Sequence, residues 1–169
     1  MMQYQAVILM SQMKRAKKDA DKRLENALYL NSKLKDIPGI ITYKLADGAD
    51  RSAYHLYPFR YKKEYFDDLP RAKFLKALSA EGIPCSGGYG PQYNDGLMEE
   101  ALSSKGYQRL FSKQRLDTYR EELKNLPDNE QLCQEAVWMY QNMLLAERKD
   151  MDDIVNAIQK IYENRKQML

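Results

Sequence analysis

The stretch that decides the fold is GIPCSGGYGPQY, which runs from Gly82 to Tyr93. It directly follows an uninterrupted helix-forming run from Arg71 to Glu81. Gly82 suits the left-handed position just beyond the end of a helix. The later glycines and prolines permit sharp turns and a close approach of the backbone to other groups. We therefore expect a helix, a short strand over residues 84–88, and then a tight turn.

The N-terminal segment predicts one long helix. Residues 3–35 contain no Gly or Pro, and Pro38-Gly39 ends the run. Apolar residues recur close to the 3.6-residue helical period, at Ala6, Leu9, Met10, Met13, Ala16, Ala20, Leu24, Ala27, Leu28 and Leu34. The first turns are apolar on nearly all sides, which indicates that a larger protein or another subunit buries that end.

The middle of the chain predicts two strands and a helix. Residues 40–43 are β-branched and aromatic, and residues 53–61 are rich in aromatic side chains. Pro58 lacks an N–H group, so it favours a strand edge or a bulge. Asp67 and Asp68 supply an acidic N-cap region for the helix that follows.

The last part of the chain is mixed. Residues 94–124 are polar with scattered apolar positions, so we expect short surface helices, with a further turn or two over residues 128–135. Residues 136–139 suit a short strand. A helix beginning at Asp150 carries an apolar stripe. The whole pattern predicts an α+β fold of two layers: an antiparallel or mixed sheet of three to four strands, packed against helices.

Composition excludes several classes of protein. The net charge is only +3, and basic residues are interspersed with acidic ones rather than massed, which argues against a nucleic-acid binder. No apolar run approaches the roughly 20 residues needed to span a bilayer, and no secretory signal is present at the start. The two cysteines have no metal-site spacing. We expect a cytoplasmic protein that binds neither nucleic acid nor membrane, and holds no metal.

Two residues are candidate catalytic groups with simpler alternatives. His55, the single histidine, is a possible general base, but a half-buried strand residue with a hydrogen bond is the favoured interpretation. Cys85 has no basic neighbour in sequence that would lower its pKa, so we expect an inert, partly buried thiol. A hydrolase built on these two residues is therefore disfavoured, and we assign no catalytic residue.

Tyr89 and Tyr93 are the better binding candidates. A tyrosine on a glycine-rich turn presents an apolar ring and a hydroxyl, which suits packing on a sugar and bonding to its hydroxyl groups. Packing across a domain or subunit interface is an equally good explanation of the same two residues.

The order of these motifs resembles the C-terminal small domain of the DegT-type sugar aminotransferases, which have the aspartate aminotransferase fold of type I. Five stretches carry the likeness in the expected order along nearly the whole chain: MQYQAV with RLENALYLN and IPGI, the aromatic strand, ALSAEGIPCSGGYGPQY, AVWMYQNMLL and DMDDIVNAIQKI. The resemblance implies that residues 1–36 are a connecting helix and residues 37–169 the small domain. The large cofactor-binding domain is then absent from this sequence.

The resemblance also implies a function. Family enzymes are dimers that transfer an amino group from glutamate or glutamine to a keto sugar, often nucleotide-linked, or to a cyclitol, using pyridoxal phosphate on a lysine. No lysine here matches that position, so the chain alone should hold no cofactor and be inactive. The substrate-binding candidates are Tyr89, Tyr93, Gln141 and Asn142.

Two departures from the usual family pattern leave the substrate open. Gly88-Tyr89 replaces a common His-Tyr pair, and Tyr93 replaces a histidine, as in a branch similar to the cyclitol and aminohydroxybenzoate enzymes. The alternative to the aminotransferase hypothesis is a stand-alone, non-catalytic domain that self-associates or regulates a partner, since a large apolar patch usually marks an interface.

Overall fold

The computed structural model describes residues 2–94 and 96–169, which form two compact units. The first unit contains residues 1–86 and 137–169, and the second contains Gly87–Ala136. The division of the chain into a connecting helix over 1–36 and a domain over 37–169 stays a prediction.

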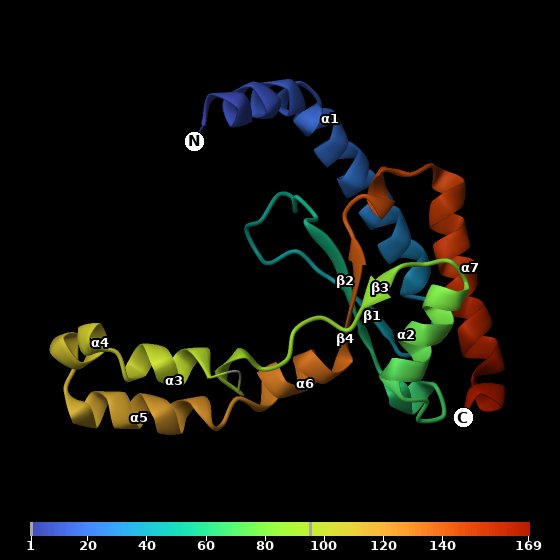
Figure 1. The fold of residues 1–169 in the computed structure, drawn as a ribbon. Helices are drawn as coiled ribbons and strands as arrows, with labels where there is room; N and C mark the ends of the chain where they lie inside the picture. The colour runs from blue at the N-terminus through green and yellow to red at the C-terminus, as the bar shows by residue number, and fades with distance from the viewer. Residues whose placement is uncertain (1, 95) are drawn as a thin grey trace. The chain divides into compact units, whose positions relative to one another are not determined.

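The first unit is an α+β structure with one antiparallel sheet (Figure 1). Its strand order is β1-β2-β4-β3, with β1 at Ile40–Thr42, β2 at Leu56–Tyr61, β3 at Cys85–Ser86 and β4 at Ala136–Tyr140. Three helices lie together on one side of the sheet: α1 (Gln3–Leu34), α2 (Arg71–Ala80) and α7 (Arg148–Asn164). This architecture confirms the predicted fold class.

The core of this unit lies between the sheet and those helices. In β2 the buried residues alternate, because successive side chains point to opposite faces of a sheet. Tyr61 stacks on Phe74 of α2, with ring centroids 4.3 Å apart, and Phe66 packs against both rings. The hydroxyl of Tyr61 donates a hydrogen bond to the carbonyl oxygen of Leu69 at 2.8 Å, so its polar end is satisfied.

The end of α2 has the expected geometry. Gly82 has φ +85°, its N–H donates to the Ser79 carbonyl, and the N–H of Ile83 donates to the Leu78 carbonyl. This pair of bonds is a Schellman motif, and the buried side chains of Leu78 and Ile83 complete it.

Several strand boundaries differ from the prediction. β2 begins at Leu56, so His55 precedes the strand and is exposed, and our expectation of a half-buried strand residue was wrong. β3 contains only Cys85–Ser86 instead of residues 84–88. Pro58 lies in β2, which is an interior strand, but the pairing with β1 ends at Phe59 opposite Thr42. The N–H of Lys62 donates to the Gly39 carbonyl on the β1 side, and every second residue of a strand points its N–H to the same side. An N–H at position 58 would therefore point toward β1, but beyond the last residue pair.

The start of α2 also differs. Its N-cap is Pro70, with no side-chain cap, whereas Asp67 and Asp68 have positive φ angles of 53° and 59°. Asp67 instead forms an ion pair with Arg165 at 3.0 Å. The acidic N-cap that we predicted is therefore absent, and one of the two carboxylates joins this turn to η4 (Arg165–Met168).

The second unit is helical, as expected for residues 94–124. Its elements are η2 (Gln92–Asn94), α3 (Leu97–Leu102), α4 (Lys105–Leu110), α5 (Lys113–Leu123) and α6 (Pro127–Glu135). Ser104 and Ser112 cap α4 and α5 by accepting hydrogen bonds from backbone N–H groups. The remaining short helices, η1 (Lys63–Tyr65) and η3 (Met143–Leu145), belong to the first unit.

The tight turn at Gly39 yields a test of the fold. Gly39 has φ +84°, and a Cβ there would lie 2.7 Å from the Cβ of Tyr65 and 2.9 Å from the Lys62 carbonyl oxygen. Gly39→Ala should lower the free energy of unfolding in urea by about 3 kcal/mol or more, because backbone strain and overpacking add.

Gly48→Ala is the matched control. Gly48 has φ +81°, but a Cβ there would meet no atom within 4 Å, so the substitution isolates the backbone strain. We expect it to cost about 1 kcal/mol. Equal effects of the two substitutions would contradict the crowded geometry at Gly39.

Candidate functional site

Tyr93 is held by a carboxylate within the second unit. Its hydroxyl donates a hydrogen bond to Glu130 Oε1 at 2.6 Å. This bond, with smaller effects from burial and from the negative charge of Glu130, raises the pKa of Tyr93 to about 12. The phenol therefore stays protonated at neutral pH, and its oxygen still has lone pairs for a ligand hydroxyl.

A hollow of about 390 Å³ lies beside this pair. Its lining combines apolar side chains with charges of both signs: Tyr93, Asn94, Met98, Glu99, Leu102, Arg120, Glu121, Leu123, Lys124 and Glu130. Convergent polar groups around an apolar floor are typical of a site for a small polar molecule or a side chain. We call it the acidic hollow.

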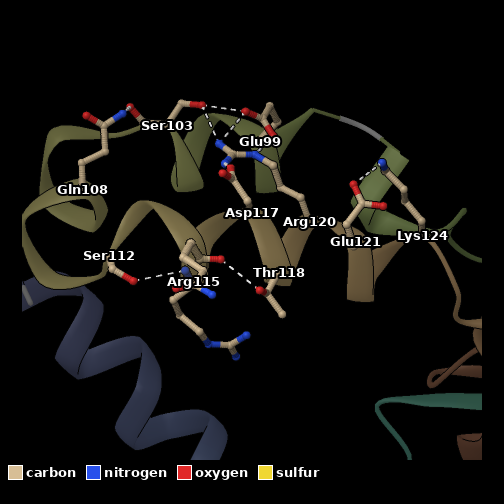
Figure 2. A network of polar contacts seen from close by, with 11 residues as sticks. Glu99, Ser103, Gln108, Ser112, Arg115, Asp117, Thr118, Arg120, Glu121 and Lys124 are labelled. Carbon is tan, nitrogen blue, oxygen red and sulfur yellow. Dashed lines mark hydrogen bonds and ion pairs between the residues drawn. The ribbon is translucent and has the colours of Figure 1, made fainter.

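One ion-pair network holds the wall of the acidic hollow (Figure 2). Arg120 of α5 donates to both carboxylate oxygens of Glu99 of α3, at 2.8 and 2.9 Å, and also to Asp117 at 3.0 Å. Ser103 adds a hydroxyl donor to Glu99 at 2.7 Å. These bonds lower the pKa of Glu99 to about 2, with the Arg120 hydrogen bonds as the main cause. The network therefore ties α3 to α5.

Tyr89 has a different environment from Tyr93. It lies on the segment between β3 and η2, and two-thirds of its surface, 67%, is exposed. An exposed ring on an irregular segment offers a face for packing against a sugar or another polypeptide. Tyr89 therefore suits packing on a sugar as well as packing across a domain or subunit interface.

Gln141 and Asn142 lie in the first unit, directly after β4. The Gln141 Oε1 atom accepts a hydrogen bond from Arg23 Nη1 at 2.9 Å. Arg23 Nε also donates to the Ala53 carbonyl at 3.3 Å, so one α1 side chain joins two loops. Asn142 is exposed and precedes η3.

The four predicted residues therefore fall into two pairs, one in each unit. Two polar partners were not predicted from the sequence: Glu130, which binds Tyr93, and Arg23, which binds Gln141. Glu130 lies 37 residues from Tyr93, and Arg23 lies 118 residues from Gln141. No local spacing in the sequence therefore indicates either hydrogen bond. Only the folded chain brings them together.

The disfavoured hydrolase gains no support. Burial raises the pKa of the Cys85 thiol, and a hydrogen bond with Ser79 opposes this only in part. A raised pKa lowers the fraction of nucleophilic thiolate.

Over residues 2–94 and 96–169, no group of His, Cys, Asp and Glu side chains is arranged to hold a metal ion. No helix there is long and apolar enough to cross a membrane.

Comparison with known proteins decides the family. The profile of the DegT/DnrJ/EryC1/StrS aminotransferase family matches residues 1–159. The chain belongs to this family. It is 27% identical over 160 residues to the L-glutamine:2-deoxy-scyllo-inosose aminotransferase of Streptoalloteichus tenebrarius, covering 94% of this chain and 37% of the relative. It is also 27% identical over 167 residues to a putative L-glutamine:3-amino-2,3-dideoxy-scyllo-inosose aminotransferase of Micromonospora echinospora, covering 95% of this chain and 38% of that relative.

Solved structures agree with the fold of a family member. An aminotransferase of pseudoaminic acid biosynthesis from Helicobacter pylori matches with a TM-score of 0.62 and 23% identity, over 92% of this chain and 36% of that one. A 3-amino-5-hydroxybenzoic acid synthase matches with a TM-score of 0.63 and 17% identity, over 90% and 36%. The chain thus spans little more than a third of the length of the proteins it matches.

The Glu99–Arg120 ion pair leads to a prediction about the titration of the Glu99 carboxyl group. A carboxylate with a lowered pKa stabilises the fold above its ordinary pKa of 4.5, and this contribution disappears as the pH falls toward about 2. In an NMR titration of the side-chain carboxyl carbons, Glu99 should have its midpoint near 2. Arg120→Gln should move the midpoint back toward 4.5.

Lys124→Gln is the control, because Lys124 pairs with Glu121 at 2.6 Å and not with Glu99. It should leave the Glu99 midpoint in place. A Glu99 midpoint that does not change in Arg120→Gln would contradict the assigned cause of the shift.

Proposed function

We propose that this chain is the C-terminal part of an aminotransferase that acts on a keto sugar or a cyclitol. The observation that carries the proposal is the family match over residues 1–159 in a chain that spans about 37% of its relatives. Those relatives are named for amino transfer from glutamine to inososes. Glutamine or glutamate is therefore the amino donor that we propose, and the cytoplasm the place of action.

The binding roles follow from side-chain chemistry. Tyr89 and Tyr93 line the sugar side of the completed site, where aromatic rings pack on the carbon face and hydroxyls bond to sugar hydroxyls. Glu130 orients the phenol of Tyr93 through their 2.6 Å bond. Gln141 and Asn142 border the substrate entrance, with Arg23 holding the amide of Gln141.

The family's cofactor, pyridoxal phosphate, does not fit the residues of this chain alone. The cofactor acts as an electron sink when a lysine amine holds it as a Schiff base, and such an amine is activated by desolvation or by a neighbouring cation. Among the described residues no lysine is buried, and the one buried polar residue is Asn26. We therefore assign no chemical step to these residues, and propose that the lysine belongs to the large domain.

The start of α1 is the surface that we propose the large domain covers. Seven large apolar side chains there are between 47% and 68% exposed: Met2, Tyr4, Val7, Ile8, Leu9, Met10 and Met13. So much apolar area on one helical segment marks an interface. The alternative function, a stand-alone domain that self-associates or regulates a partner, rests on this same surface.

Reading the coding sequence upstream of the Met1 codon in frame tests the proposal. We expect an open frame that encodes a Gly/Ser-rich phosphate turn, an aspartate and a Ser-x-x-Lys stretch. The product of that longer frame should bind pyridoxal phosphate and aminate a keto cyclitol with glutamine. In it, Tyr93→Phe should raise KM for the keto substrate by about tenfold, the effect of one lost hydrogen bond to substrate, and leave KM for glutamine unchanged.

A stop codon close upstream, together with no separately encoded large domain that binds this chain, would refute the aminotransferase proposal. The stand-alone domain would then be the better description. Leu132→Ala, an exposed position on α6, serves as the control for Tyr93→Phe and should change neither KM.

A further inference from the structure

Arg23 of α1 joins a loop to a strand end without pairing with a carboxylate. Its side chain is half-buried, its Nε atom donates to the Ala53 carbonyl oxygen at 3.3 Å, and its Nη1 atom donates to Gln141 Oε1 at 2.9 Å. Both acceptors are neutral oxygens, and within the described part of the chain no acidic side chain forms an ion pair with Arg23. The guanidinium therefore keeps its full positive charge beside the Gln141 amide.

This contact decides which end of the Gln141 amide is available to a ligand. A guanidinium has only N–H donors, so the amide must turn its oxygen toward Arg23 and its nitrogen away. Gln141 is exposed, and none of the residues that the structure describes accepts a hydrogen bond from its Nε2 atom. Gln141 thus offers two N–H donors, while its acceptor is engaged.

The charge on Arg23 also strengthens those donors. A hydrogen bond from an ionised donor is stronger than one between neutral groups, and linked hydrogen bonds polarise one another. The cation draws electron density toward Oε1, which leaves the N–H groups of the same amide more positive. A glutamine without such a neighbour can turn either end of its amide to a ligand. Arg23 therefore converts Gln141 into a donor.

The backbone before β2 keeps the Ala53 carbonyl in place for Arg23. Tyr54, the next residue, has a φ of +46°, which is rare for an aromatic residue, and only 3% of its surface is exposed. Its ring stacks on Tyr57 with centroids 6.2 Å apart and meets Tyr43 edge-on at 6.4 Å. Backbone of this kind persists only where packing holds it, and it clusters at binding sites.

We propose that Arg23 is a positioning residue that sets Gln141 as a hydrogen-bond donor to the keto substrate. The inference rests on the proposed function, in which Gln141 borders the substrate entrance, and it adds the polarity of that contact. The substrate group that Gln141 binds is an oxygen that accepts. It is the carbonyl oxygen, or a hydroxyl oxygen whose own proton is already donated.

The orientation of Gln141 is tested in the 169-residue chain itself. By NMR relaxation, the order parameter of the Gln141 side-chain amide should exceed about 0.6 in the wild type and fall below that value in Arg23→Leu. Arg51→Gln is the matched control. It lies on the same loop as Ala53 and removes a different ion pair with α1, the one to Asp21 at 2.8 Å. It should leave the Gln141 amide unchanged.

Gln141→Glu separates the donor role from a purely structural one. The carboxylate still accepts from Arg23, and more strongly, but it has no N–H group to donate. It should therefore unfold at the same urea concentration as the wild type or a higher one. In the product of the longer upstream frame, calorimetric titration with 2-deoxy-scyllo-inosose in the absence of glutamine should show about tenfold weaker binding, the effect of one lost hydrogen bond.

Two results would overturn the inference and leave the proposed function standing. One is equal order parameters of the Gln141 amide in the wild type and in Arg23→Leu. The other is a Gln141→Glu protein that binds 2-deoxy-scyllo-inosose as tightly as the wild type. A longer protein that binds no keto cyclitol or keto sugar would instead refute the proposed function, and this inference with it.

Discussion

The buried amide of Asn26 is the contact on which the arrangement of the first unit depends. Asn26 is fully buried in α1, and its Nδ2 atom donates to the carbonyl oxygens of Leu144 at 2.9 Å and Ala146 at 3.0 Å. Two donated bonds from one side chain hold the turn between β4 and α7 against the helix. Because unsatisfied buried carbonyls are costly, the turn has few other positions that it can adopt.

Other polar side chains on the same stretch of α1 extend this contact in both directions. Arg23 holds Gln141, and Tyr29 donates to Asp152 of α7 at 2.5 Å. The guanidinium of Arg148 lies over the ring of Tyr29, 4.2 Å from its centroid. Positions 23, 26 and 29 are three residues apart, so they lie near one side of the helix. The helix register therefore determines where the proposed entrance residue Gln141 lies.

Local chemistry made much of this fold predictable. The helix end at Gly82 needs only a left-handed residue and a buried neighbour, both visible in the sequence, and the apolar period of α1 and α7 is equally local. The contacts that shape the acidic hollow and that hold Gln141 are not local. Glu99 and Arg120 are 21 residues apart, and each also resembles an ordinary solvated helix residue.

Asn26 shows the limit most clearly. Asparagine is mostly found at protein surfaces, so no pattern of residue types indicates that this one is buried. Its partners are backbone carbonyls, which carry no sequence signal. The predicted start of β2 was wrong for a related reason. Residues 53–55 have strand-like neighbours, but the paired region of β2 begins only at Leu56. Tertiary packing decided both features.

The most direct test of this account is the free energy of unfolding of Asn26→Asp at neutral pH, measured in urea. Aspartate has nearly the same shape but cannot donate to the two carbonyls, and it buries a charge. We expect a loss of at least about 3 kcal/mol. Asn164→Asp, which removes an exposed donor to the Lys160 carbonyl, should cost less than about 1 kcal/mol. Equal small losses in the two variants would contradict the central role of Asn26.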